Sequence, residues 1–209
     1  AKMDGLLHAH VGETDVVAGA LADIERKVSA VVETARRSYS SVDVLVFSDH
    51  GMVETRGEID LMAEVEATGL IHERDYLAFY DSTMARFWFE SEGAREKITG
   101  VLDRVGRGTI LSDDDLRREG VFFEDRRYGE LVFLMDPGML VVPSFMGARA
   151  PRGMHGFTPE HEDMDAVIMS SRPLTGHVIG ISDTYDVLFD SVMRDEIAGD
   201  GQVGKGGSD

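Results

Sequence analysis

The stretch VDVLVFSDHGM, residues 42–52, decides the expected fold. Its first half, Val42–Phe47, is a short apolar run rich in β-branched residues, which predicts a buried strand of a parallel sheet. The run ends abruptly in Ser48-Asp49-His50-Gly51. Open α/β sheets place their functional sites just beyond the C-terminal ends of buried strands. We therefore expect an α/β fold, with a mainly parallel sheet and a site at Asp49 and His50.

Helices are expected both before and after this strand along the chain. The segment from Glu13 to about Tyr39 predicts a long amphipathic helix, because apolar residues recur there at three- and four-residue steps with charges between them. Thr14 or Asp15 can cap its start. The segment Asp183–Glu196 predicts a closing helix.

Residues 71–130 differ from the rest of the chain in their pattern of expected strands and helices. They predict two strands, then a helix over Ala94–Val105, and then a short helix that Ser112 can cap. We expect a small α+β cap insertion over residues 71–130, a core formed by residues 1–70 and 131–197, and a flexible tail over 198–209. The expected strands after Val42–Phe47 are Tyr76–Tyr80, Met84–Glu90, Ile110-Leu111, Leu131–Met135, Leu140–Val142, Met164–Met169 and His177–Ile181.

The charge balance limits the kinds of partner. The 209 residues carry a net charge of −18, which repels the phosphates of a nucleic-acid polymer. Only four of the basic residues are lysines, a composition that adaptation to high salt and a GC-rich genome explain equally well. The apolar runs are far shorter than the roughly 20 residues of a membrane-spanning helix, so we expect no membrane segment and a cytoplasmic location.

The absence of cysteine limits the kinds of metal site. It excludes disulfides and thiolate ligands, so a metal site must be built from histidines and carboxylates. Such ligands suit Zn²⁺, with Mn²⁺ or Fe as alternatives.

Three clusters offer these ligands. Asp4 and His8 are four residues apart, which places both side chains on one side of a helical turn. Asp49 and His50 follow the expected strand, and His155 lies between glycines in Gly153-Met154-His155-Gly156. Each cluster alone has an ordinary reading, as a solvated helix face, a capping aspartate or a loop histidine.

Together the clusters follow a known order. Asp-x-x-x-His, a long helix, a strand ending in Ser-Asp-His-Gly-Met, and a distant His-Gly-Phe resemble the nucleotide pyrophosphatase/type I phosphodiesterase branch of the alkaline phosphatase superfamily. Asp4 and Asp49 are 45 residues apart, and His50 and His155 are 105 apart, which leaves room for the cap insertion. The resemblance implies an alkaline-phosphatase-like core and hydrolysis of phosphodiesters, nucleotide pyrophosphates or monoesters.

The resemblance also implies roles for these residues. Asp4, His8 and His155 would hold one divalent metal, and Asp49 and His50 a second, with zinc the expected metal and manganese an alternative. The substrate would be a small phosphate ester or a nucleotide.

Two departures from the family pattern stand out. The family's nucleophile, a Thr or Ser, and a further Asp lie well before the Asp-x-x-x-His motif, whereas here only three residues precede Asp4. We therefore expect a fragment that is inactive alone, with its nucleophile upstream of Ala1 in a missing N-terminal half. Gly12 stands four residues after His8 instead of three, so His10 is an alternative to His8 as the ligand.

Other functions remain open at this point. A non-catalytic metal-binding or interaction domain would also keep these ligands without a nucleophile. Phosphonate hydrolases and phosphoglycerate mutases share the metal frame within the same superfamily.

Overall fold

The structure is a computed structural model that describes residues 2–174 and 180–200. The chain divides into two compact units. The first unit comprises Ala1–Lys27 and His50–Asp165, and the second comprises Val28–Asp49 and Ala166–Asp209.

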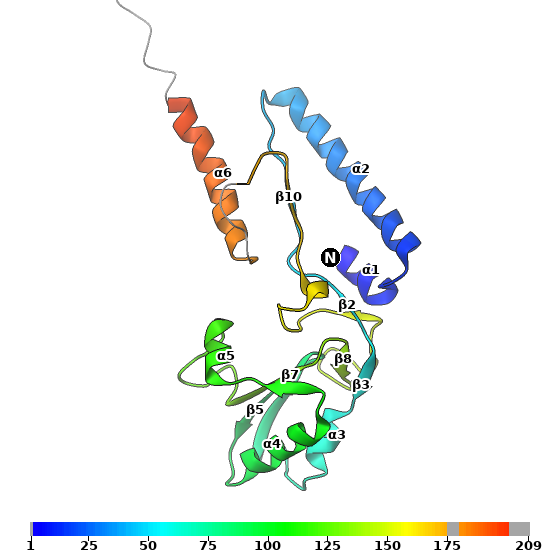
Figure 1. Ribbon diagram of the computed structural model, residues 1–209, viewed down its shortest axis with the longest axis vertical. Helices are drawn as coiled ribbons and strands as arrows, with labels where there is room; N and C mark the ends of the chain where they lie inside the picture. Colours follow the sequence, from blue (N-terminus) through cyan, green and yellow to red (C-terminus); the bar gives the residue numbers. More distant parts are fainter. Residues whose placement is uncertain (1, 175–179, 201–209) are drawn as a thin grey trace, which may run out of the picture. The chain divides into compact units, whose positions relative to one another are not determined.

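A four-stranded antiparallel sheet is the centre of the first unit (Figure 1). The apolar side chains of α4 (Ala94–Val105) and those of the sheet form one buried core, in which Ile98, Phe87 and Phe133 are almost fully buried. Helix α5 (Asp113–Arg118) begins with a capping box between Ser112 and Asp115. The strands, in sheet order, are β4 (Tyr76–Tyr80), β5 (Met84–Phe89), β7 (Leu131–Met135) and β6 (Gly108–Ile110).

Shorter elements of the first unit carry the histidines discussed below. Helix α1 (Lys2–His10) contacts β9 (Gly153–Met154), and β9 pairs with β2 (Val53–Glu54). The remaining elements are β3 (Gly57–Ile59) in parallel with β8 (Met139–Val141), helix α3 (Leu61–Glu66) and the 3₁₀ turn η1 (Glu162–Met164).

The second unit is built from long, sparsely buried elements. Helix α2 (Thr14–Ser38) crosses the division between the units, and β1 (Leu45–Phe47) pairs antiparallel with β10 (Ile168–Ser170). The last helix, α6, covers Asp183–Asp200. Thr184 is the only buried residue among those of this unit whose burial the structure describes.

The α/β fold class and most of the expected elements are confirmed. Helix α2 covers the predicted Glu13–Tyr39 segment apart from its ends, α4 begins and ends where predicted, and α6 contains Asp183–Glu196. The strands expected at Tyr76–Tyr80, Met84–Glu90 and Leu131–Met135 are β4, β5 and β7. These helices and strands therefore lie where the sequence pattern predicts them.

The prediction of a buried parallel strand at Val42–Phe47 is wrong. The strand is shorter, its ladder with β10 is antiparallel, and Phe47 is 47% exposed. An apolar run shows that a strand is apolar on both faces, but it does not specify the direction of the partner strand or what covers each face.

Two further expectations concern segment limits. Strand β7 lies between β5 and β6, so Leu131–Met135 belongs to the same sheet as the strands of the expected insertion. Residues 177–179 of the expected strand His177–Ile181, and residues 201–209 of the expected tail, lie outside the described residues, whereas α6 continues to Asp200.

No helix in the described ranges combines the length and the apolar character that a membrane crossing requires.

Candidate metal centre

Three side chains of the first unit converge on one point. Asp4, His50 and His155 each offer a ligand atom, and these atoms lie within 4.8 Å of one another. They come from α1, from the loop before β2 and from the loop after β9, so the fold joins positions as much as 151 residues apart. All three residues are partly buried, and together they offer the oxygen and nitrogen ligands that zinc and manganese accept.

The carboxylate of Asp4 is the centre of this group. Its Oδ1 lies 3.3 Å from Nε2 of His8 and 3.5 Å from Nε2 of His155. Both contacts are within ion-pair range, yet this oxygen is buried without a hydrogen bond of normal geometry among the described residues. A buried oxygen in that state, facing imidazole nitrogens, fits a position for a bound cation.

The orientation of His50 is fixed by its own loop. Its Nδ1 lies 2.8 Å from the carbonyl oxygen of Gly51, so Nδ1 carries the proton and donates it there. A Cβ atom at Gly51 would lie 2.1 Å from the carbonyl oxygen of Asp163, so only glycine fits. The ring stacks on that of His155, with centroids 3.7 Å apart, and with the proton on Nδ1 the lone pair of the ring is on Nε2.

The ring of His8 is oriented in the same way, by a backbone carbonyl, although His8 is not one of the three grouped residues. Its Nδ1 donates to the carbonyl oxygen of Gly153 at 2.7 Å, which leaves the Nε2 lone pair facing Asp4. The rings of His8 and His155 have centroids 5.3 Å apart. This geometry suits either a fourth ligand or a partner that orients Asp4.

His10 is engaged on another side of α1. Its Nδ1 contacts Oε2 of Glu13 at 3.2 Å, and Arg152 pairs with the other oxygen of that carboxylate. The hydrogen bond with His10 holds the pKa of Glu13 below its ordinary value, and the positive charge of Arg152 lowers it further. Since His10 is paired with Glu13 while His8 faces Asp4, the geometry favours His8 as the residue of the metal centre.

The resemblance implied that His50 and Asp49 hold a second metal. A ligand atom of His50 lies within 4.8 Å of those of Asp4 and His155, and the division of the ligands between two ions stays a prediction. Asp49 precedes His50 directly but is the last residue of its segment in the second unit, and its role as a ligand stays a prediction.

One neighbour of the centre was not foreseen from the sequence. Thr83, which is 3% exposed, places its Oγ1 3.1 Å from where a Cβ of Gly156 would lie. It therefore packs against the backbone directly after His155. Its only signal in the sequence is its place in the tight turn between two strands, which does not reveal a contact with residue 156.

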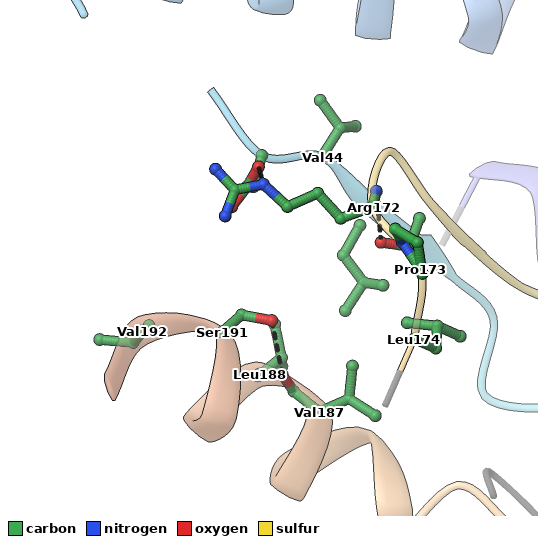
Figure 2. Close-up of a pocket in the computed structure, with 11 residues that line it drawn as sticks. Val44, Arg172, Pro173, Leu174, Val187, Leu188, Ser191 and Val192 are labelled. Atoms are coloured by element: carbon green, nitrogen blue, oxygen red, sulfur yellow. Dashed lines mark hydrogen bonds and ion pairs between the residues drawn. The ribbon is translucent and has the colours of Figure 1, made fainter. Parts of the chain in front are cut away.

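The larger of the two described cavities contains none of these ligands. It measures about 760 Å³ and lies in the second unit, between α6 and the β1–β10 pair (Figure 2). Leu174, Val187 and Leu188 line it, and its carboxylate, Asp43, pairs with Arg172 at 2.5 Å. Its two serines are engaged locally, since Ser191 Oγ donates to the carbonyl oxygen of Val187 and Ser170 Oγ accepts from the backbone N–H of Arg172. The cavity has no cluster of metal-ligand residues among the described ones, so the metal centre is the better candidate site.

Comparison with known protein families identifies one match. The sequence profile of the type I phosphodiesterase / nucleotide pyrophosphatase family matches residues 1–158. A comparison with curated proteins found no significant match.

Several solved structures share the fold. Human ectonucleotide pyrophosphatase/phosphodiesterase 5 matches with a TM-score of 0.72 and 16% identity, over 90% of this chain and 51% of that one. An inactive murine form of the same protein in complex with AMP gives 0.71 and 17%, over 90% and 50%. Phosphonoacetate hydrolase from Sinorhizobium meliloti 1021 gives 0.52 and 14%, over 73% and 42%. The chain thus spans about half the length of the solved structures that it matches, and it shares with them a partial alkaline-phosphatase-like core.

Proposed function

Because the chain belongs to the type I phosphodiesterase / nucleotide pyrophosphatase family, we propose that it forms the metal-binding part of a metal-dependent phosphate-ester hydrolase. The proposed substrates are small phosphodiesters, nucleotide pyrophosphates or phosphate monoesters. The match to a murine relative in complex with AMP supports a nucleotide as one member of this class.

The observation that carries the proposal is the state of Asp4. A buried carboxylate oxygen without a hydrogen bond is costly unless a cation or a donor compensates its charge. Asp4 and the imidazoles of His50 and His155 surround one point, and a divalent cation there would compensate that oxygen. His8 is the proposed additional ligand, and Asp49 the proposed ligand of a second ion.

The proposed metals are two divalent ions, zinc or alternatively manganese. When bound, they would supply Lewis-acid stabilisation of charge on phosphoryl oxygens and activation of a nucleophile. The residues of this chain prepare that site. The carbonyl groups of Gly51 and Gly153 hold the protons of His50 and His8 on Nδ1, so both Nε2 atoms present lone pairs.

The nucleophile is proposed to come from outside this chain. Hydrolysis through a covalent intermediate needs a hydroxyl held beside the metals. The chain spans about half the length of its structural relatives, which supports a contribution from a further segment of the same protein. On this proposal the 209-residue chain binds metal but does not turn over phosphodiesters.

Metal titration of the chain tests the proposal. Calorimetry with Zn²⁺ should find a tight site that Asp4→Asn and His155→Ala each weaken by more than about 100-fold, because each removes a ligand. The matched control is His161→Ala, whose ring accepts a hydrogen bond from Asp163 N and is outside the triad. The net charge of −18 adds weak, nonspecific cation binding, so only the tight site is diagnostic. Zn²⁺ affinity that is equal in the wild type and Asp4→Asn would refute the metal centre.

Two alternatives have support. The match to phosphonoacetate hydrolase favours phosphonate hydrolysis as the second candidate reaction. Turnover of phosphonoacetate but not of a nitrophenyl phosphodiester, measured on the longest protein that includes this chain, would select it. Tight metal binding with no turnover of either substrate by that protein would select a non-catalytic metal-binding domain. The shared metal frame leaves a phosphoglycerate-mutase-like reaction as a further member of the enzyme class.

A further inference from the structure

A second cavity lies in the first unit and uses none of the metal-centre residues. It measures about 350 Å³, within the usual range for small-molecule pockets. It lies at the open edge of the four-stranded sheet, between the edge strand β4, helix α3 and the turn at Ser144–Gly147. Its lining is rich in aromatic side chains, and the residues that matter here are Glu66, Tyr76, Phe79, Tyr80, Ser144 and Phe145.

The outer wall of this cavity is an exposed aromatic ring. Phe145 is 80% exposed, and its ring lies 4.9 Å from that of Phe79, tilted by 34°. Its backbone N–H donates to the carbonyl oxygen of Tyr80 at 2.7 Å, which fixes the turn on the edge of β4. A phenyl ring held at a cavity mouth by its backbone is a surface on which a planar group can stack.

The inner wall contains an unpaired hydroxyl. Tyr80 is 7% exposed, and its Oη is buried with no hydrogen bond of normal geometry among the described residues. Burial raises the pKa of Tyr80, and its contact with the hydroxyl of Tyr76, which is near enough for a weak hydrogen bond, raises it further, so Tyr80 stays protonated and can donate. A buried donor whose only contact is this weak one gains a bond of normal geometry when a ligand acceptor is placed beside it.

The charge around the cavity limits the ligand. The carboxylate of Glu66 lies close enough to both tyrosines to raise the pKa of each. This negative charge in a partly buried cavity disfavours an anion inside it. The walls and the donor therefore suit a flat, uncharged ring that has a hydrogen-bond acceptor.

We propose that this cavity binds a neutral heteroaromatic ring, such as the purine base of a nucleoside, stacked on Phe145 and accepting a hydrogen bond from Tyr80 Oη. This second site is distinct from the metal centre and binds without a phosphoryl group. It is nevertheless joined to the metal centre by a short path. Ser144 Oγ lies 3.2 Å from Ser82 Oγ, and the next residue, Thr83, packs against Gly156 beside His155.

Adenosine is the probe for this site, because it has the base but no phosphoryl group to bind a metal. Calorimetric or NMR titration of the chain in excess EDTA should detect saturable binding. Tyr80→Phe should weaken it by about fivefold, the effect of one neutral hydrogen bond. Phe145→Ala should weaken it by about tenfold through lost stacking. Phe123→Ala, which removes another exposed phenylalanine of the first unit, should leave it unchanged.

The outcomes separate this site from the proposed metal centre. No binding at millimolar adenosine, or binding insensitive to both Tyr80→Phe and Phe145→Ala, would overturn the proposal. Binding that requires added Zn²⁺ and disappears in Asp4→Asn would move adenosine to the metal centre and overturn it equally. Because the titration is done in EDTA, failure of the metal proposal does not change the expected result. Circular dichroism of each variant should match the wild type, and Phe145→Ala, at a ring that is 80% exposed, tests the site independently of the buried Tyr80.

Discussion

The two units of this chain have similar hydrophobic patterns but very different burial. The buried members of the hydrophobic core all lie between Val53 and Phe157, in the first unit. Among the described residues of the second unit no large apolar side chain is buried, and several are exposed, including Val31 at 69%, Tyr185 at 69% and Val192 at 63%. The second unit nevertheless contains the C-terminal part of the long amphipathic helix and the apolar strand from which the fold was inferred.

This difference separates the origin of secondary structure from the origin of stability. An apolar stripe on a helix specifies a face that must be covered, and stability follows only when another surface covers it. In the first unit the sheet and α4 cover each other. We therefore infer that the stability of the isolated chain comes from the first unit, and that α6 and the β1–β10 pair open readily.

Hydrogen exchange tests this comparison with the largest expected effect. Amides of β5 and β7 should exchange only through global unfolding, whereas those of α6 should exchange through local opening. For a domain of ordinary stability the two rates should differ by more than about 1,000-fold. Mass spectrometry of peptides from 84–89 and 183–192 measures both. Equal protection of the two peptides would mean that the second unit has a core of its own.

Two phenylalanines provide the next test. Phe133 is 1% exposed in β7, and Phe47 is 47% exposed in β1. Phe133→Ala should lower the free energy of unfolding by about 3–5 kcal/mol, because it leaves a cavity in the core. Phe47→Ala should change it by less than about 1 kcal/mol. Urea denaturation followed by circular dichroism measures both, and a larger effect at Phe47 would contradict the assignment of the core to the first unit.

The sequence predicts single elements well and their partners poorly. Helix α4 and strands β4 and β7 were predictable because periodicity and caps are local properties. The antiparallel ladder of β1 with β10, and the insertion of β7 between β5 and β6, were not, because pairing depends on residues far away in the chain. The expected limits of the insertion at residues 70 and 130, which rested on the pattern of strands and helices and on the gap between His50 and His155, stay a prediction.

The candidate site shows the same limit. The residue types and the helical spacing of Asp4 and His8 identify candidate ligands from the sequence, and their side chains lie 3.3 Å apart. Which ligands share a point is a property of the fold. His50 joins Asp4 and His155 because its loop, with Gly51 against the backbone of Asp163, turns the ring toward His155. No local pattern in the sequence encodes that contact.

The acid sensitivity of the first unit gives a smaller effect. Asp75 accepts hydrogen bonds from Arg74 and from the backbone N–H of Ile71, and these lower the pKa of its carboxyl group to about 2. Since the folded-state pKa lies below the unfolded value of about 4, the carboxylate stabilises the fold above pH 4 and this contribution is lost as pH falls toward 2. Asp75→Asn should therefore lower the melting temperature at pH 6 and reduce its decline between pH 4 and pH 2. Thermal melts over that range measure this, with Asp186→Asn in α6 as the control; a decline as steep as in the wild type would show that other carboxylates cause it.

The smallest expected effect is an increase in stability on substitution, and a pair of tyrosines tests it. Tyr80 is buried with an unpaired hydroxyl, whereas Tyr185 of the second unit is 69% exposed. Tyr80→Phe removes a buried hydroxyl that makes no hydrogen bond of normal geometry, so it should stabilise the chain by about 1 kcal/mol, or about 2–4 °C in melting temperature. Tyr185→Phe should change the melting temperature by less than 1 °C, about the size of an ordinary surface substitution. Scanning calorimetry without ligand measures both. A destabilised Tyr80→Phe variant would mean that the hydroxyl has a partner in the free protein, whereas a more stable variant that binds adenosine less well would show that the unpaired hydroxyl is kept for a ligand.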